Sequence, residues 1–180
     1  MPVNLATVSL RSERPEDEAF LREVYASTRE EELEAAAMPV EMRAAFLDLQ
    51  FKAQQKGYRG MYPRAEFHII QLGNRSVGRM VVNRAAGELR LVDIALLPHY
   101  RNQGIGTALI QKLSAEAAAT GRPLRLSVVK GQRAFQLYQR LGFAKTGESG
   151  WHDQMEWRAG QSPPPAHPND ATRSKTAAPG

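Results

Sequence analysis

The sequence predicts an α/β protein with a mixed central β-sheet flanked by helices, in the element order β-α-α-β-β-β-α-β-α-β-β. Two observations lead to this prediction. Residues 66–97 contain three β-forming segments separated by turn residues, and the last of them runs into an amphipathic helix followed by another apolar strand. A strand, a helix and a strand in that order form a crossover, which places two parallel strands in one sheet.

The N-terminal third supplies one strand and two helices. Val8 to Leu10 is typical of a short strand, and Pro15 with the acidic residues after it suits a first helical turn. Pro39 separates the two helices, and the second is expected to end near Gly57. Helical spacing groups two apolar sets, each on one face: Phe20, Leu21, Val24 and Tyr25, then Met42, Phe46, Leu49 and Ala53.

The remaining elements follow from turn residues and apolar periodicity. Gly73-Asn74 predicts a hairpin between residues 66–72 and 77–82, and Pro98 closes a strand over residues 89–97. A helix is expected from Gly104 to Thr120, with Gly121 after it. The last predicted elements are a strand at 124–129, a helix at 132–141 and two short strands near 143–146 and 155–157.

Composition limits the classes of function. The chain has 180 residues, a net charge of +5 and no cysteine, so thiolate chemistry and disulfides are excluded. The basic residues are dispersed, which is typical of a solvated surface and gives no support for a nucleic-acid partner. No signal peptide and no apolar run of about 20 residues is visible. We therefore expect a soluble, cytoplasmic protein without a membrane partner.

The C-terminal segment differs from the rest of the chain. Residues 160–180 are rich in Pro, Ser and Ala and have no apolar periodicity. Such a segment cannot bury enough surface to offset the entropy lost on ordering. The sequence therefore predicts one folded domain over residues 1–159 and a disordered tail over 160–180.

A glycine-containing turn joins the strand at 89–97 to the helix that follows it. Arg101-Asn102-Gln103-Gly104-Ile105-Gly106 places two glycines and one arginine where unpaired helix N–H groups attract anions. A dinucleotide fingerprint would need a third glycine, but Leu109 stands there, and no G-K-[ST] triplet of a P-loop is present. The turn indicates a phosphate site of another kind.

Two motifs together resemble the GNAT superfamily of N-acetyltransferases. The first is the [RQ]-x-x-G-x-[GA] pattern at Arg101 to Gly106, and the second is A-x-x-L-Y-x-x-x-G-F at Ala134 to Phe143. The resemblance covers residues 77–157 well and the N-terminal third only in element order. It implies a GNAT-like fold, an acetyl-CoA-dependent N-acetyltransferase and direct attack by a primary amine in a ternary complex.

The resemblance also implies roles for individual residues. The strand before the turn would offer the backbone groups of Ile94 and Leu96 to the pantetheine arm. Tyr138 matches the tyrosine that acts as general acid toward the CoA thiolate, although a core aromatic is the plain alternative. The remaining residues implied to bind the cofactor are Arg101, Asn102, Gln103, Gly104, Ile105, Gly106, Thr107 and Gln132.

Several points stay open in the sequence. The base that deprotonates the amine is Asp93, Glu66 or His68, with Asp93 lying in the cofactor strand. Gln132 stands where many relatives have asparagine, which leaves a non-catalytic acyl-CoA-binding or regulatory module as the alternative function. No cluster of His, Asp and Glu has the spacing of a metal site. The acceptor is a small-molecule or peptide amine, and the resemblance allows a homodimer.

Overall fold

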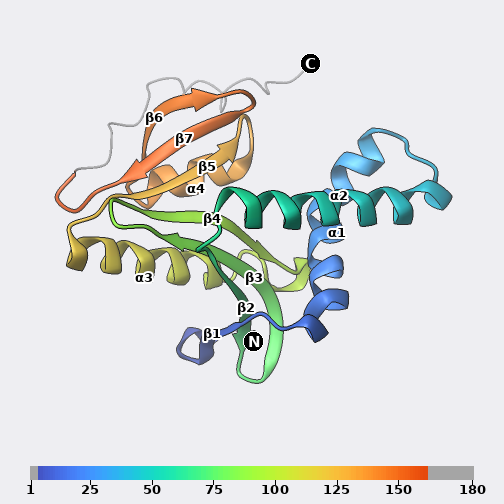
Figure 1. Cartoon of the computed structure of the whole chain (residues 1–180), viewed down its shortest axis with the longest axis horizontal. Helices are drawn as coiled ribbons and strands as arrows, with labels where there is room; N and C mark the ends of the chain where they lie inside the picture. Colours follow the sequence, from blue (N-terminus) through green and yellow to red (C-terminus); the bar gives the residue numbers. More distant parts are fainter. Residues whose placement is uncertain (1–3, 162–180) are drawn as a thin grey trace, which may run out of the picture.

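The computed structural model describes residues 4–161, and its centre is one seven-stranded sheet (Figure 1). Neighbouring strands are antiparallel except β4 and β5, which are parallel, so the predicted crossover is confirmed. From residue 162 onward, the predicted tail lies outside the described residues. In sheet order the strands are β1 (Val8–Ser12), β2 (Glu66–Leu72), β3 (Arg75–Arg84), β4 (Leu89–Leu96), β5 (Leu124–Val129), β7 (His152–Trp157) and β6 (Ala144–Ser149).

Helices and short 3-10 turns connect the strands. The mixed α/β architecture and the order of the elements agree with the prediction, and the 3-10 turns are the main additions. Within residues 4–161, no helix has both the length and the apolar character needed to cross a membrane. The helices are α1 (Glu18–Ala35), α2 (Val40–Met61), α3 (Ile105–Thr120) and α4 (Arg133–Arg140), and the 3-10 turns are η1 (Leu5–Thr7), η2 (Pro15–Asp17) and η3 (Pro98–Tyr100).

The two faces of the sheet are covered by different helices. Successive strand residues point to opposite faces, and the neighbours Ile69 and Ile70 in β2 show this division. Ile70 belongs to the larger core, to which α3 and α4 contribute, whereas Ile69 packs with Leu21 and Tyr25 of α1 and Phe51 of α2. Figure 1 shows α3 and α1 on opposite sides of the sheet. A side chain in β3 or β4 therefore meets either α3 and α4 or α1 and α2.

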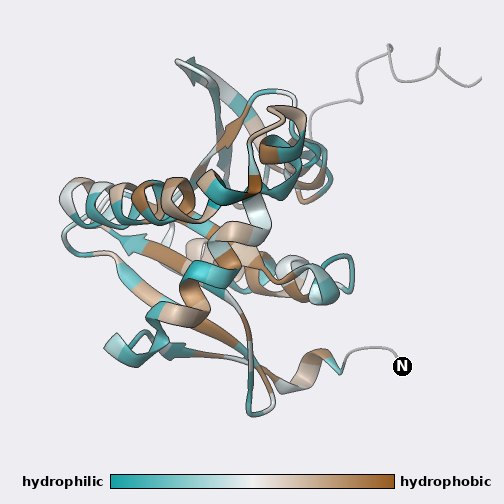
Figure 2. Cartoon of the chain, turned by 90° about the vertical axis from the view of Figure 1, so that its right-hand side faces the viewer, coloured by the Kyte–Doolittle hydropathy of each residue, from teal (hydrophilic) through white to brown (hydrophobic). Residues whose placement is uncertain are grey.

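Hydropathy follows this layering. Figure 2 shows brown, apolar segments along strands in the middle of the molecule, and mixed teal and brown along the helices. Leu21, Val24 and Tyr25 are buried on α1, which confirms the predicted apolar face of that helix. The helices thus turn an apolar side toward the interior and a polar side toward solvent.

Helix α2 differs from the prediction in where it ends and in the exposure of its apolar face. It continues through Gly57 to Met61, about one turn beyond the end expected near Gly57. Gly57 lacks the positive φ of a helix-ending glycine, and the Tyr58 ring after it packs 5.7 Å from the Arg79 guanidinium. The predicted apolar face of α2 exists, but its large side chains are exposed rather than packed on the domain: Met42, Phe46 and Leu49.

Candidate active site

Strands β4 and β5 are paired over only part of their length. Their parallel ladder joins residues 89–91 to residues 124–126, although β4 continues to Leu96 and β5 to Val129. The register between β3 and β4 shifts at the same place, because Val82 faces Leu91 whereas Val81 faces Asp93. This shift leaves residue 92 as a bulge, and a bulge bends the strand that contains it. The second half of β4 therefore diverges from β5.

The direction of the β4 backbone groups follows from the ladder with β3. The Leu97 N–H donates to the Val77 carbonyl at 2.9 Å, so this pair is hydrogen-bonded. In an antiparallel ladder, hydrogen-bonded and non-hydrogen-bonded pairs alternate. Ile94 and Leu96 therefore belong to non-bonded pairs, and their backbone groups point away from β3 toward the gap beside β5. The structure places the two residues predicted for the pantetheine arm along this gap.

The turn after β4 leads into an unobstructed helix N-terminus. Asn102 and Gly104 have φ values of 58° and 83°, and left-handed residues in such turns direct backbone N–H groups toward one concave side. Within the described residues, no side chain caps α3, and an added Cβ at Gly106 would meet no atom within 4 Å. The first turn of α3 therefore leaves free N–H groups and open space beside a glycine, as a bound anion requires.

The side chain of Arg101 has partners within the chain. Its Nε donates to the Leu96 carbonyl at 2.8 Å, and its Nη2 donates to Ser27 Oγ at 2.9 Å and to the Ser27 carbonyl at 3.1 Å. Ser27 lies on α1, so Arg101 joins the turn to that helix. The predicted contact between this guanidinium and a phosphate stays a prediction. What the structure shows is an arginine that fixes the end of β4 against α1.

Asp93 faces α1 and α2, on the side of β4 opposite to Ile94 and Leu96. Its Oδ2 accepts a hydrogen bond of 2.7 Å from Nε of Arg79, and Nη2 of Arg79 lies 2.5 Å from the same oxygen. Arg79 is only 3% exposed, and its Nη2 also donates to Gln54 of α2. A buried guanidinium thus orients the Asp93 carboxylate. The sequence analysis missed Arg79, although an arginine inside an apolar strand is the signal that could have found it.

Two tyrosines lie within the field of the Asp93 carboxylate. Tyr138 of α4 is 8% exposed, and burial raises its pKa to about 12, with the negative charge of Asp93 adding to the shift. Tyr58 of α2 has its pKa raised by burial and, secondly, by Asp93. Tyr138 belongs to the side of the sheet covered by α3 and α4, whereas Tyr58 belongs to the α2 side. The charge of Asp93 therefore acts on phenols from both faces of the sheet.

Tyr138 also has a packing role. Its ring meets that of Phe143 edge-on, with the centroids 5.7 Å apart, and both rings belong to the larger core. Within the described residues, the Tyr138 hydroxyl makes no hydrogen bond. The structure shows the packing role that the sequence left as the plain alternative, and the role of Tyr138 as general acid stays a prediction.

The other predicted residues divide between the site and the rest of the sheet. Gln132 is the N-cap residue of α4 and is exposed, and its side chain makes no capping bond to that helix. Glu66 and His68 of β2 lie 3.2 Å apart, and Glu66 is linked through Arg84 to Glu116 of α3. They are therefore on the α3 side of the sheet, separated from Asp93 by the sheet itself. Of the three candidate bases, only Asp93 lies on β4, in the part of that strand beyond its ladder with β5.

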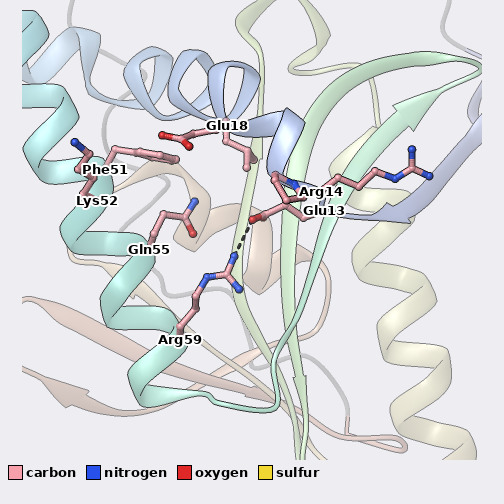
Figure 3. A pocket seen from close by; sticks show the side chains of 9 residues that line it. Glu13, Arg14, Glu18, Phe51, Lys52, Gln55 and Arg59 are labelled. Carbon is pink, nitrogen blue, oxygen red and sulfur yellow. Dashed lines mark hydrogen bonds and ion pairs between the residues drawn. The ribbon is translucent and has the colours of Figure 1, made fainter.

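A hollow on the surface lies at a different place from these residues. Its volume is about 380 Å³, and Figure 3 shows Gln55 and Arg59 of α2 reaching toward Glu13, with an Arg59–Glu13 ion pair of 2.8 Å. None of the residues predicted for the site lines it. Burial raises the pKa of Glu13. We do not assign the chemistry to this hollow, because the free N–H groups, the splayed strands and Tyr138 lie at a different place.

Metal ligation has no support in the part of the chain that the structure describes. Within residues 4–161, no three His, Asp or Glu side chains lie close enough to hold one ion together. The polar groups of this region are backbone N–H groups, the Asp93 carboxylate and the two phenols on which its charge acts. Such groups can bind an anion, accept a proton and donate a proton.

Comparison with known families agrees with this geometry. Residues 63–145 match a family model described as an acetyltransferase (GNAT) domain. A curated relative, a thialysine N-epsilon-acetyltransferase from Bos taurus, is 43% identical over 65 residues, which cover 34% of this chain. The match spans 38% of that relative's length, so it compares only a part of each protein.

Solved structures share the fold over most of the chain. An acetyltransferase from Thermus thermophilus has a TM-score of 0.65 and 20% identity, covering 88% of this chain and 99% of its own. The PaiA N-acetyltransferase from Thermoplasma acidophilum, in complex with coenzyme A, has a TM-score of 0.64 and 18% identity, covering 84% of this chain and 98% of its own. A GNAT family acetyltransferase from Elizabethkingia anophelis with acetyl-CoA bound has a TM-score of 0.53 and 14% identity, covering 84% of this chain and 98% of its own.

Proposed function

We propose that this chain, whose residues 63–145 match a GNAT acetyltransferase domain, is a member of that superfamily and transfers the acetyl group of acetyl-CoA to a primary amine. The observation that carries the proposal is the gap between β4 and β5, which opens beside the uncapped N-terminus of α3. A strand edge can pair with an extended amide-containing arm, and a helix N-terminus can bind a pyrophosphate. CoA has both groups in series.

The cofactor would lie with its pantetheine arm along β4 and its pyrophosphate at the turn. Ile94 offers its backbone groups to the gap, whereas the Leu96 carbonyl already accepts from Arg101, so its N–H is the group left for the arm. The backbone from Gln103 to Thr107 would bind the pyrophosphate, with Gly106 leaving room for the phosphate oxygens. Asn102 would shape this turn, and Arg101 would hold it in place.

Tyr138 would assist the departure of the thiolate. In the reaction the amine nitrogen bonds to the acetyl carbon, and the bond from that carbon to the CoA sulfur breaks with its electron pair going to sulfur. A phenol whose pKa is raised to about 12 is fully protonated at neutral pH. It therefore always has a proton to donate as negative charge develops on sulfur. The raised pKa also makes the Tyr138 phenol a weaker acid. It would therefore first donate a hydrogen bond to the developing thiolate and transfer its proton only afterwards.

Asp93 would receive the proton that the amine must lose. An amine attacks only as the neutral base, so an ammonium acceptor has to give a proton to the protein or to water. Arg79 holds Oδ2 of Asp93, while Oδ1 makes no hydrogen bond within the described residues. Oδ1 is thus the atom available to the acceptor or to a connecting water. Tyr58 would form the wall of the acceptor site on the α2 side.

The acceptor would be a small molecule or a peptide that presents a primary amine. The curated bovine relative is named for acetylating the ε-nitrogen of thialysine, which supports a primary amine on an aliphatic side chain as the first compound to test. Carboxylates on α1 around Glu30 and Glu31 are exposed and would attract a cationic acceptor. One of that group, Glu32, already pairs with Arg29 at 3.0 Å.

A non-catalytic acyl-CoA-binding module is the second candidate, and Gln132 is the observation that favours it. Its side chain is exposed at the start of α4, where the resemblance expects asparagine. Glutamine has one more methylene, so its amide would reach a different point of the cofactor. A module of this kind would bind CoA without transferring an acetyl group.

Thiol release from acetyl-CoA separates the two functions. We would incubate the full chain with acetyl-CoA and single amines, among them lysine, thialysine, a polyamine and a peptide, and identify acetylated products by mass spectrometry. An enzyme releases one thiol for each acetylated amine. If CoA raises the melting temperature while no amine of the panel is acetylated, the binding module is the correct function.

A further inference from the structure

One side of α2 is apolar and uncovered along most of the helix. Met42 is 61% exposed, Phe46 38% and Leu49 66%, and they follow one another at helical spacing. Three small residues, which are also exposed, continue the same side over about 27 Å at a rise of 1.5 Å per residue. We call the six residues together the α2 stripe: Met42, Phe46, Leu49, Ala53, Gly57 and Gly60.

The other side of α2 already has its partners within the chain. Phe51 packs on Tyr25 of α1, with the ring centroids 5.8 Å apart, and Gln54 accepts from the buried Arg79. Phe51 and Gln54 point away from the stripe on the helical wheel. The stripe therefore contributes little to the packing of α2 on its own domain.

Nothing inside the described chain requires glycine at the two glycine positions of the stripe. An added Cβ at Gly57 or Gly60 would meet no atom within 4 Å, and neither residue has a positive φ. Glycine within a helix is less stable than almost any other residue. Two glycines about one turn apart on an exposed face therefore indicate that another backbone approaches the helix there.

The α2 stripe is complementary to the same stripe of a second copy that runs in the opposite direction. Its large side chains occupy the N-terminal half and its small residues the C-terminal half, so a second α2 laid antiparallel on the first places large residues against small ones. We propose that α2 is the interface of a two-fold symmetric dimer of this chain, packed in this way. One register satisfies three pairs at once: Met42 with Gly60, Phe46 with Gly57, and Leu49 with Ala53.

The charges of α2 fit this arrangement. Lys56 is the charged residue nearest the stripe, and the same register places it beside Ala45 of the second copy, where its amine can reach solvent. Lys52 at the flank is paired with Asp48 at 2.8 Å. We favour a second copy over an unrelated protein as the partner of the stripe. A two-fold interface uses the same surface on both subunits, so that surface must be complementary to itself, whereas binding to an unrelated protein does not require this.

Sedimentation velocity over a concentration series tests the dimer. A single helix pair is at the small end of stable interfaces, so we expect a dissociation constant in the micromolar range. Leu49→Glu should raise that constant at least tenfold. Val40→Glu, which changes an apolar residue that is 72% exposed on another side of α2, should leave it unchanged. A wild-type chain that stays monomeric up to about 200 µM overturns the proposal.

Cysteine cross-linking tests the register, since the chain has no cysteine of its own. In the proposed dimer, residue 46 lies beside residue 57 of the second copy, whereas two copies of residue 46 are about 16 Å apart. A disulfide needs Cα atoms within about 7 Å. Mixed Phe46→Cys and Gly57→Cys chains should therefore cross-link on oxidation. Either variant cross-linking with itself instead contradicts the register.

A third variant separates association from folding. Gly57→Leu should keep or raise the melting temperature of the monomer, because leucine is the better helix former and the position is open. The same change should weaken the dimer at least tenfold, because the added side chain holds the two helices apart. A Gly57→Leu chain that dimerises as well as wild type excludes close packing at this residue.

Discussion

The Nε of Arg79 in β3 donates to Oδ2 of Asp93 in β4 over 2.7 Å, between the sheet and α2. The relationship ties the candidate base to a guanidinium that is almost completely buried. Charges removed from water are stable only when paired and hydrogen-bonded. The pair therefore decides both the local stability of the fold and the direction in which the carboxylate points.

Replacing Arg79 with methionine should destabilise the protein by about 2–4 kcal/mol, because it leaves a partly buried carboxylate without its partner. Urea denaturation followed by circular dichroism measures the change. Arg158→Met, which breaks the more exposed pair with Glu156, should cost less than about 1 kcal/mol. The double change Arg79→Met with Asp93→Leu should recover part of the loss. A loss below about 1 kcal/mol for Arg79→Met alone would contradict the assigned role.

Replacing Tyr138 with phenylalanine should lower kcat by about 100-fold, because the ring stays packed against Phe143 while the donor to the thiolate is lost. The measurement is thiol release at saturating acetyl-CoA with the best amine of the panel. Tyr62→Phe, at the end of α2, removes a hydroxyl outside the site and should leave kcat unchanged. Full activity in Tyr138→Phe would remove the tyrosine from the mechanism.

Stability should fall at alkaline pH because of the buried phenols. The pKa of Tyr138 is about 12 in the folded chain and about 10 in an unfolded one. Between these values the unfolded state loses the proton and the folded state keeps it, so the free energy of unfolding decreases as pH rises from about 10 to about 12. The full difference corresponds to at most about 3 kcal/mol. Denaturant unfolding at several pH values measures the slope, which should be smaller in Tyr138→Phe.

A valine at Gly106 should abolish the stabilisation of the protein by CoA without harming the fold. The position is open, because an added Cβ meets no described atom within 4 Å. The valine side chain would instead occupy the space through which phosphate oxygens approach the first turn of α3. Thermal unfolding with and without CoA measures this. Gly87→Val, at another open glycine in the β3–β4 loop, should keep the wild-type shift. An unchanged shift in Gly106→Val would place the phosphates elsewhere.

Local sequence signals were sufficient for the elements around the turn. The strand at 89–97, Gly104 and the apolar helix after it are each identified by neighbours within a few residues, and the structure has β4, η3 and α3 there. Successive residues of a strand point to opposite faces, so Asp93, three positions before Leu96, lies on the other face of β4. The family resemblance implied only that Ile94 and Leu96 offer backbone groups to the pantetheine arm, whereas the divergence of β4 from β5 and the bulge at residue 92 depend on pairing between strands.

Contacts between distant segments could not be predicted in this way. Arg79 and Asp93 are 14 positions apart on two strands, and Gln54 reaches them from a helix, so no periodicity of one segment relates them. The contact of Arg101 with α1 spans 74 positions. Helix α2 has two apolar sides, and its sequence alone does not say that Phe51 packs inward while Leu49 stays exposed.

The sequence by itself determined the order of the elements and the candidate anion-binding turn, because each depends on backbone preferences and spacing within a short stretch. The candidate tyrosine followed from the resemblance of residues 134–143 to a family motif. The tertiary structure decided which candidate base lies beyond the β4–β5 ladder, what Arg101 holds and which side of α2 is free. Those outcomes depend on the pairing of β3 with β4 and the packing of α1 and α2 on the sheet, and burial selects them only when the whole fold is assembled.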